Sequence, residues 1–257
     1  MWSFIVTVFV SEIFRYPVKG LSAESMPEVR LSAGAGLPLD RQFAICHGRS
    51  GFDARQTKWH QRHEFLQVAH HPQLVLLDVS FDASSEVLTV RRDGKIAVSA
   101  KVNDEAGRAD IDAFVAEFMR DDDPGPTRLV SAPGVMFTDQ PDKLVSLIHR
   151  ASLADLGTHL AAFPDEARFR GNLIIDGGRP WQEFEWLGRE LRVGEATLRI
   201  VGRIDRCAAT TANPTTGERD LNIPKALQAA YGHIDCGVFG EVIGGGIVRP
   251  GDAVIVQ

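Results

Sequence analysis

Short runs of apolar residues, separated by turn-forming residues, constrain the fold of this chain more than any other feature of its sequence. Runs of about four to eight residues, rich in branched and aromatic side chains and bounded by Gly, Pro, Asn or Asp, are typical of β-strands. Helical patterns are confined to three modest segments, at 111–119, 151–160 and 224–231. The chain is therefore predicted to be mainly β, of the α+β class, with a few peripheral helices. We expect strands at 8–15, 28–31, 42–46, 74–81, 87–91, 96–99, 173–175, 186–193, 195–201, 239–243 and 253–256.

An acidic segment rich in Pro and Gly, Asp121 to Pro126, is the clearest interruption of these patterns. Such a segment cannot contribute to a hydrophobic core, so we expect an exposed connection there. A chain of 257 residues suits one large domain or two small ones. We therefore predict one domain at 8–123 and a second domain at 127–257.

Two local signals make sharper predictions. Asp93-Gly94 lies between two expected strands and predicts a tight hairpin. Ser152 stands at the start of the second helical segment, and Asp155 follows three residues later. This spacing resembles a capping box, so Ser152 is predicted to cap the helix.

The overall charge and the first residues exclude several classes of protein. The net charge is -6, so no global basic field favours nucleic-acid binding. The uncharged apolar run at 4–10 is far shorter than the roughly 20 residues of a membrane-spanning helix. The first basic residue, Arg15, follows that run, which is the wrong order for a signal peptide. We expect a cytoplasmic protein that binds neither membranes nor nucleic acid, and we leave open whether residues 1–10 are the true N-terminus.

The cysteines are expected to act singly rather than to form a disulfide framework. Cys46, Cys207 and Cys236 are few and scattered, and no C-x-x-C motif occurs. A disulfide scaffold and a structural zinc or iron–sulfur site are therefore not expected. This usage fits a reducing compartment.

The segment from Arg203 to Asp220 is the leading candidate for chemistry. Cys207 lies between two arginines, Arg203 and Arg206, just after an expected strand. Nearby positive charge favours the thiolate, which is the form that attacks electrophiles and binds soft metals. Thr210 and Thr211 follow it. The alternative is a buried, inert cysteine, which is the commoner fate of a free thiol.

A second constellation is Arg168-Phe169-Arg170-Gly171-Asn172, which precedes an expected strand. Arginines that alternate around an aromatic residue at a strand edge point to the same side. They could hold a phosphate by forked hydrogen bonds. The alternative is ordinary surface ion pairing, which stabilises little. Lys19 and Asp40-Arg41 are further charged candidates with the same alternative.

Several of these segments, taken in order, resemble a known family. It is the MOSC family, in the branch that carries the N-terminal MOSC β-barrel domain and includes the mitochondrial amidoxime-reducing component and its bacterial relatives. The resemblance runs from about Ser11 to the end of the chain. The segments are Tyr16-Pro17-Val18-Lys19-Gly20, Leu39-Asp40-Arg41, Ala151 to Leu156, Arg168 to Asn172, Arg206-Cys207 with Thr210-Thr211, Asn213 to Gly217, and Phe239-Gly240 through Gly251-Asp252.

The resemblance implies a MOSC-type β-barrel and a site for the molybdenum cofactor, molybdopterin. Cys207 would be the catalytic residue and would supply a thiolate to the metal. A thiolate is a soft ligand and suits such a metal centre. The cofactor-binding residues implied by motif position are Lys19, Arg41, Ser152, Arg170, Asn172 and Arg206, with Thr210 and Thr211 as weaker candidates. Pyridoxal phosphate is not expected, because Lys19 is the only lysine in a family motif that could form its Schiff base.

The activity that the resemblance implies is that of a molybdenum-dependent oxidoreductase acting on an N-hydroxylated or similarly oxygenated small molecule. The chain stops at Gln257 without clustered cysteines, so we expect electrons from a separate ferredoxin-, flavodoxin- or cytochrome-type partner. Two alternatives stay open. Cys207 could carry sulfur as a persulfide, or the protein could bind the cofactor without turnover.

Three positions depart from the family pattern. Gly20 stands where relatives commonly have Ser, and Gly171 replaces a common Pro. Asp205 precedes Arg206 where a small polar residue is more usual. If its carboxylate points inward, its negative charge would oppose thiolate formation at Cys207.

Overall fold

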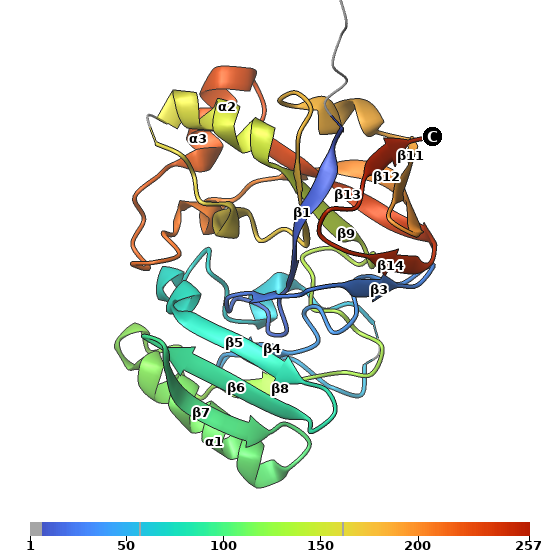
Figure 1. Cartoon of the computed structure of the whole chain (residues 1–257). Coiled ribbons are helices and arrows are strands. Elements are labelled where there is room, and N and C mark those ends of the chain that lie inside the picture. The colour runs from blue at the N-terminus through green and yellow to red at the C-terminus, as the bar shows by residue number, and fades with distance from the viewer. Residues whose placement is uncertain (1–6, 57, 161) are drawn as a thin grey trace, which may run out of the picture.

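A computed structural model describes residues 7–56, 58–160 and 162–257 (Figure 1). The question of the true N-terminus falls mostly on residues 1–6, which lie outside the described residues. Within the described residues, no helix combines the length and the apolar character that crossing a bilayer requires.

An eight-stranded sheet is the largest element of the structure (Figure 1). Neighbouring strands run antiparallel, except β9 and β10, which are parallel. The order is β15 (Val254–Val256), β11 (Glu190–Val193), β12 (Ala196–Asp205), β13 (Asp235–Gly244), β9 (Val145–His149), β10 (Leu173–Asp176), β1 (Phe9–Arg15) and β2 (Glu24–Ser25).

This sheet curls into a half-barrel and brings the first and last described strands together. Phe9 of β1 bridges Ala253, and the Val254 amide donates a hydrogen bond of 2.8 Å to the Val8 carbonyl. Side chains from β1, β9, β11, β12 and β13 form its hydrophobic core, including Val10, Leu147 and Val238. The curled sheet therefore includes strands from both ends of the sequence.

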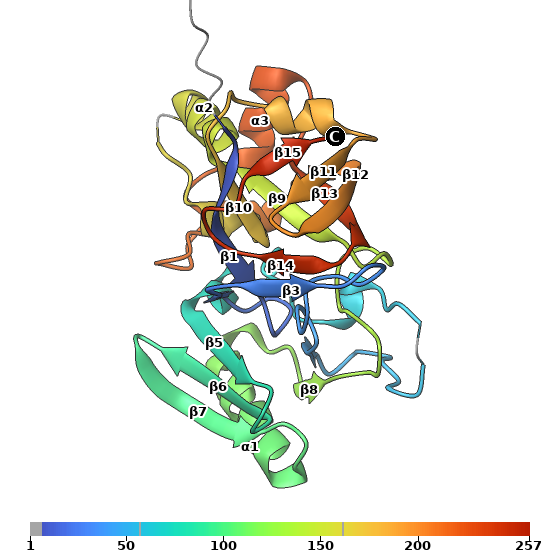
Figure 2. The ribbon, with the colours of Figure 1, turned by 45° about the vertical axis from the view of Figure 1, so that its right-hand side comes forward.

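A second layer is formed by residues 77–118, below the half-barrel in Figure 2. It is a three-stranded antiparallel sheet of β5 (Leu77–Asp82), β6 (Val87–Arg92) and β7 (Lys95–Lys101), packed on α1 (Glu105–Phe118). Its own core includes Leu88, Val90, Ile111 and Val115. The hairpin predicted at Asp93-Gly94 is confirmed, because it joins β6 to β7.

Two short strand pairs join distant parts of the chain. β3 (Val29–Leu31) pairs with β14 (Gly246–Val248), and β4 (Ala44–Cys46) pairs with β8 (Arg128–Val130). Figure 2 shows β3 and β14 side by side between the half-barrel and the smaller sheet. These pairings, and the place of β1 in the large sheet, cross the boundary expected at 123–127. The division into domains 8–123 and 127–257 stays a prediction.

The remaining helices cover the outer side of the half-barrel (Figure 1). α2 (Arg150–Leu160) and α3 (Ile223–Tyr231) pack on a cluster that includes Leu153, Leu156, Ile223 and Leu227. Three α-helices among the described residues, against fifteen strands, confirm the mainly β prediction.

Two expected strand starts are wrong. Residues Pro72–Leu76 form a 3-10 turn, so β5 begins only at Leu77. Gln182–Trp186 form another 3-10 turn, and β11 begins at Glu190. In both places the apolar residues pack as a turn on the core, which periodicity alone does not separate from a short strand.

Ser152 does not cap α2, which corrects the capping-box prediction. The helix begins at Arg150, directly after β9, so Ser152 lies inside its first turn. Its hydroxyl is fully buried and donates to the Glu183 carboxylate at 2.8 Å instead of accepting from the helix backbone. A distant buried acceptor has therefore replaced the local cap.

Candidate functional site

A cavity of about 360 Å³ is lined by residues from two stretches of the chain, 19–69 and 137–239. Its cationic side chains outnumber its carboxylates, although the whole chain carries a net charge of -6. The cavity is thus a local positive region on an acidic protein. The lining cations are Lys19, Arg41, Arg62, Arg168, Arg170 and Arg206, and the lining carboxylates are Asp40, Asp139 and Asp205.

Cys207 lies where β12 ends and a short 3-10 turn, Ala208–Thr211, begins. The predicted position at the end of a strand is therefore confirmed. Cys207 is exposed and lines the cavity, whereas Cys46 and Cys236 are buried. Burial raises the pKa of the Cys236 thiol to about 12. Cys207 is thus the cysteine that a ligand in the cavity can reach.

Thr210 also lines the cavity and holds the backbone of Cys207 in place. The Cys207 carbonyl accepts hydrogen bonds from the Thr210 amide at 3.1 Å and from the Thr210 hydroxyl at 2.9 Å. The hydroxyl is therefore engaged with the turn, so Thr210 acts mainly by positioning the cysteine.

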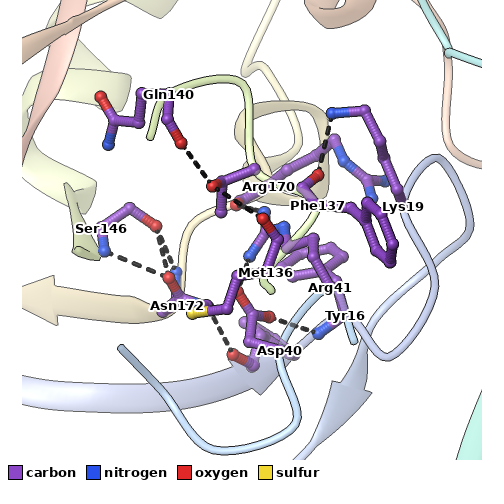
Figure 3. A network of polar contacts seen from close by, with 12 residues as sticks. Tyr16, Lys19, Asp40, Arg41, Met136, Phe137, Gln140, Ser146, Arg170 and Asn172 are labelled. Carbon is purple, nitrogen blue, oxygen red and sulfur yellow. Dashed lines mark hydrogen bonds and ion pairs between the residues drawn. The ribbon is translucent and has the colours of Figure 1, made fainter. Parts of the chain in front are cut away.

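Tyr16 orders two of the cavity arginines (Figure 3). The guanidinium carbons of Arg41 and Arg170 lie 4.3 and 4.5 Å from the centroid of the Tyr16 ring. Each contact is a cation–π interaction, which is strongest where water is excluded. Tyr16 is only 2% exposed, and its role was not seen in the sequence. The ring thus keeps two like charges close together on one wall.

Hydrogen bonds fix the same two arginines. The buried Asp40 carboxylate accepts from the Tyr16 amide at 2.8 Å and forms an ion pair with Arg41. Arg41 Nη2 donates to the Arg170 carbonyl at 2.9 Å. Arg41 and Arg170 have φ values of 48° and 52°, a left-handed conformation that costs a non-glycine residue about 1 kcal/mol or more. The contacts with Asp40 and Tyr16 maintain this strained geometry.

The Arg170 guanidinium stacks on Tyr16 but has no carboxylate partner in the part of the chain that the structure describes. Among the described residues, no carboxylate lies within ion-pair distance of its guanidinium. Burial, helped by the nearby Arg41 charge and opposed by Tyr16, lowers the pKa of Arg170 to about 10. The group still carries its charge at neutral pH. It is therefore available to donate to an anionic ligand.

Lys19 is a second buried cation, and its side chain is only 9% exposed. Its ammonium donates to the Phe137 carbonyl at 3.0 Å and forms an ion pair with Asp139. Burial lowers the pKa of Lys19, and the Asp139 charge opposes that shift. Asp139 was not predicted, and no sequence signal could have found it, because 120 positions separate it from Lys19.

Arg206 and Asn172 line the cavity, but their side chains are engaged with protein groups. Arg206 donates to the carbonyls of Phe169 at 2.9 Å and Cys236 at 2.8 Å. The Asn172 amide oxygen accepts from the Ser146 amide and hydroxyl at 3.1 and 2.9 Å. Both residues therefore build the wall more than they offer free donors.

Ser152 and Thr211 are not among the residues that line the cavity, and their roles as cofactor-binding residues stay predictions. The Ser152 hydroxyl is taken up by Glu183 and by the Trp181 amide, which donates to it at 2.8 Å. The Thr211 hydroxyl donates to the Ala208 carbonyl at 2.7 Å and accepts from Arg219 at 2.6 Å.

Arg168 and Arg170 both line the cavity, although not from a strand edge as expected. Glu166–Phe169 form a 3-10 turn, and Arg170 follows it in the left-handed conformation. Arg168 is held by Asp220 at 2.8 Å and by the Thr211 carbonyl at 3.2 Å. Its buried Nε atom has no hydrogen-bond partner among the described residues.

The departures from the family pattern have local explanations. Gly20 has a φ of 89°, a conformation that serine rarely adopts. A Cβ at Gly171 would lie 2.2 Å from Ile148 Cγ1, so any larger residue would clash. Asp205 is exposed and lines the cavity, and among the described residues it forms no ion pair.

Comparison with protein families defines the class of this chain. Residues 135–255 match the model of the MOSC domain, and residues 7–127 match the model of the MOSC N-terminal β-barrel domain. Together the two matches cover nearly all of the sequence. The chain belongs to the MOSC family and carries the family's N-terminal β-barrel domain.

Individual relatives have names connected with the molybdenum cofactor or with amidoxime reduction. The chain is 37% identical over 73 residues to a molybdenum cofactor sulfurase of Drosophila grimshawi, a match that covers 28% of this chain and 9% of that protein. It is 33% identical over 87 residues to mitochondrial amidoxime reducing component 2 of Rattus norvegicus, covering 34% of this chain and 25% of the relative. These two matches thus span well under two thirds of either relative.

Two longer matches are more distant. The chain is 23% identical over 263 aligned positions to mitochondrial amidoxime-reducing component 1 of Homo sapiens, covering 88% of this chain and 72% of that protein. Among solved structures, the YUAD protein of Bacillus subtilis covers 99% of this chain at 12% identity and a TM-score of 0.45, with 97% of that chain matched.

Proposed function

We propose that the cavity binds a molybdenum cofactor, with the Cys207 thiolate as a ligand of the metal. We further propose that the protein is an oxidoreductase that removes oxygen from N-hydroxylated or similar small molecules. The observation that carries the proposal is a reachable thiol in a cavity whose cations come from distant segments of the chain. The relatives named for amidoxime reduction support the same class of substrate.

The residues present fit such a cofactor. A thiolate is a soft ligand that suits a soft metal centre. The pterin part of the cofactor carries a phosphate, and Arg170 has no carboxylate partner among the described residues, so its guanidinium can donate in a forked arrangement. Lys19 and Arg41 add positive charge on the same wall. A net positive lining is what an anionic cofactor requires.

The chain would supply position and electrostatics. The bound cofactor would supply the redox chemistry. Thr210 holds the backbone of Cys207, Tyr16 holds Arg41 and Arg170, and Arg206 and Asn172 keep the wall in place. Electrons would come from a separate ferredoxin-, flavodoxin- or cytochrome-type protein, and we propose the cytoplasm as the compartment.

The test is metal and pterin analysis of the protein produced in a host that builds the cofactor. We expect molybdenum and pterin in a fixed ratio to the chain. Cys207→Ser should lose both the metal and the reduction of an N-hydroxylated test substrate. The variant and the wild type should melt at the same temperature when both are free of cofactor, because Cys207 is exposed. Cys46→Ala is the matched control, since it removes a thiol that does not line the cavity. Folded wild-type protein without molybdenum or pterin would refute the proposal.

A second function, sulfur transfer, is favoured by the exposure of Cys207 and by the similarity to molybdenum cofactor sulfurases. Here Cys207 would carry a persulfide and pass its outer sulfur to an acceptor. Mass spectrometry of the metal-free protein after incubation with a persulfide donor would show one added sulfur atom on Cys207. An unmodified Cys207, or addition to Cys46 and Cys236 alike, would exclude this function.

A further inference from the structure

The ion pair between Lys19 and Asp139 joins two groups with very different freedom. The Lys19 side chain is 9% exposed, and its ammonium is also held by the Phe137 carbonyl at 3.0 Å. The Asp139 side chain is 62% exposed and belongs to the segment between β8 and β9, outside any helix or strand. Both residues line the cavity. The lysine is therefore fixed, whereas the carboxylate can leave towards water.

The burial of the Lys19 ammonium explains why the ion pair with Asp139 matters. A buried ammonium without a counter-charge is costly, so Lys19 needs an anion beside it in every state of the protein. Asp139 supplies that anion when the cavity holds no ligand. An anionic group of a ligand could make the same contact with Lys19, and Asp139 would lose little on returning to solvent because it is already mostly exposed.

We propose that Asp139 is an exchangeable counter-ion of Lys19, which an anionic group of the ligand must displace to bind. The inference builds on the proposed function only in taking the cavity as the ligand site. It makes Asp139 a determinant of specificity, because a ligand must compete with a carboxylate for Lys19. Multiply charged phosphate groups compete better than single carboxylates, so the wild-type cavity selects the former.

The experiment uses the full chain produced in a host that cannot build the cofactor, titrated calorimetrically with inorganic pyrophosphate. Asp139→Asn should tighten binding about five- to tenfold, because one competing charge is removed from a partly buried pair. Asp205→Asn is the matched control, since it removes one negative charge from the same cavity without breaking an ion pair. It should change the affinity less than about twofold.

A double-mutant cycle ties the effect to the lysine. In a Lys19→Gln background, Asp139→Asn should change the affinity less than about twofold, because no ammonium remains to compete for. Acetate should compete with pyrophosphate in Asp139→Asn but not in the wild type. Asp139→Ala should act in the same direction as Asp139→Asn, and melting temperatures would confirm that each variant is folded.

Three outcomes would overturn the inference: equal effects of Asp139→Asn and Asp205→Asn, an undiminished effect in the Lys19→Gln background, or no pyrophosphate binding by any variant. The assay contains no molybdenum and no turnover. Failure to find metal in the cofactor-producing host would therefore leave this result intact, and a loaded, active protein would not rescue it.

Discussion

The buried carboxylate of Glu183, which contacts His149 and Ser152, gives the sharpest test of what stabilises the fold. Glu183 and His149 are both 0% exposed, and His149 Nδ1 lies 3.0 Å from a Glu183 oxygen. His149 Nε2 lies 2.6 Å from the Gly177 carbonyl. Both ring nitrogens face acceptors, which favours the doubly protonated imidazolium. Burial acts to lower the pKa of His149, but the Glu183 hydrogen bond and charge outweigh it, so that the net pKa is raised.

Glu183→Gln would leave a buried imidazolium without its counter-charge. Removing one partner of a buried ion pair costs about 3–5 kcal/mol of unfolding free energy. We expect a loss near the lower figure of about 3 kcal/mol, because the glutamine oxygen can still accept from Ser152. A histidine whose folded pKa is raised contributes stability that is fully present below its unfolded pKa of about 6.5 and is lost as pH rises through the folded value. The deficit should therefore be largest near about pH 6 and should narrow towards about pH 9.

Urea denaturation followed by tryptophan fluorescence would measure the loss of unfolding free energy, since Trp181 contacts Ser152 and Trp186 stacks on His149. Glu185→Gln is the matched control, because Glu185 lies in the same 3-10 turn but pairs with Arg179 at the surface. It should leave the urea midpoint unchanged at both pH values. The reasoning is refuted if the two variants behave alike, or if the Glu183→Gln deficit grows with pH.

Two further substitutions test the walls of the cavity. Tyr16→Leu should lower the pyrophosphate affinity about tenfold and the unfolding free energy by about 2 kcal/mol, because it removes two cation–π contacts. Tyr16→Phe keeps the ring, so it should match the wild type in both calorimetry and denaturation. Gly171→Ala should destabilise the protein by about 1–3 kcal/mol through its clash with Ile148, and adding Ile148→Ala should cost less than the sum of the two single changes. Strict additivity in denaturation would contradict the clash.

The sequence predicted what depends on local pattern and on the family motifs. Alternation and turn residues indicated the mainly β class and the hairpin at Asp93-Gly94, and the motifs pointed to Cys207 and Arg170, which line one cavity. Asp139 was missed because it comes from a loop without a pattern. The motif containing Tyr16 gave no indication that its ring would order two arginines.

Ser152 shows how a local signal fails when a distant residue intervenes. Its spacing from Asp155 resembles a capping box, but β9 passes directly into α2, which starts the helix two residues earlier. The partner that claims the hydroxyl, Glu183, is 31 positions away in the chain. No pattern within one turn of the helix can encode such a contact.

The pairing of β1 with the segment that leads into β15 has a consequence for synthesis on the ribosome. Phe9 emerges from the ribosome long before its partner Ala253, because 244 positions separate the two residues. Throughout that interval the early strand exposes an unpaired backbone edge, which is a template for pairing with other chains. Contacts so far apart in sequence also form slowly. A nascent or truncated chain that lacks the late segment should therefore self-associate, and a fragment of residues 127–257 alone should need a peptide of residues 7–15 to stay in solution.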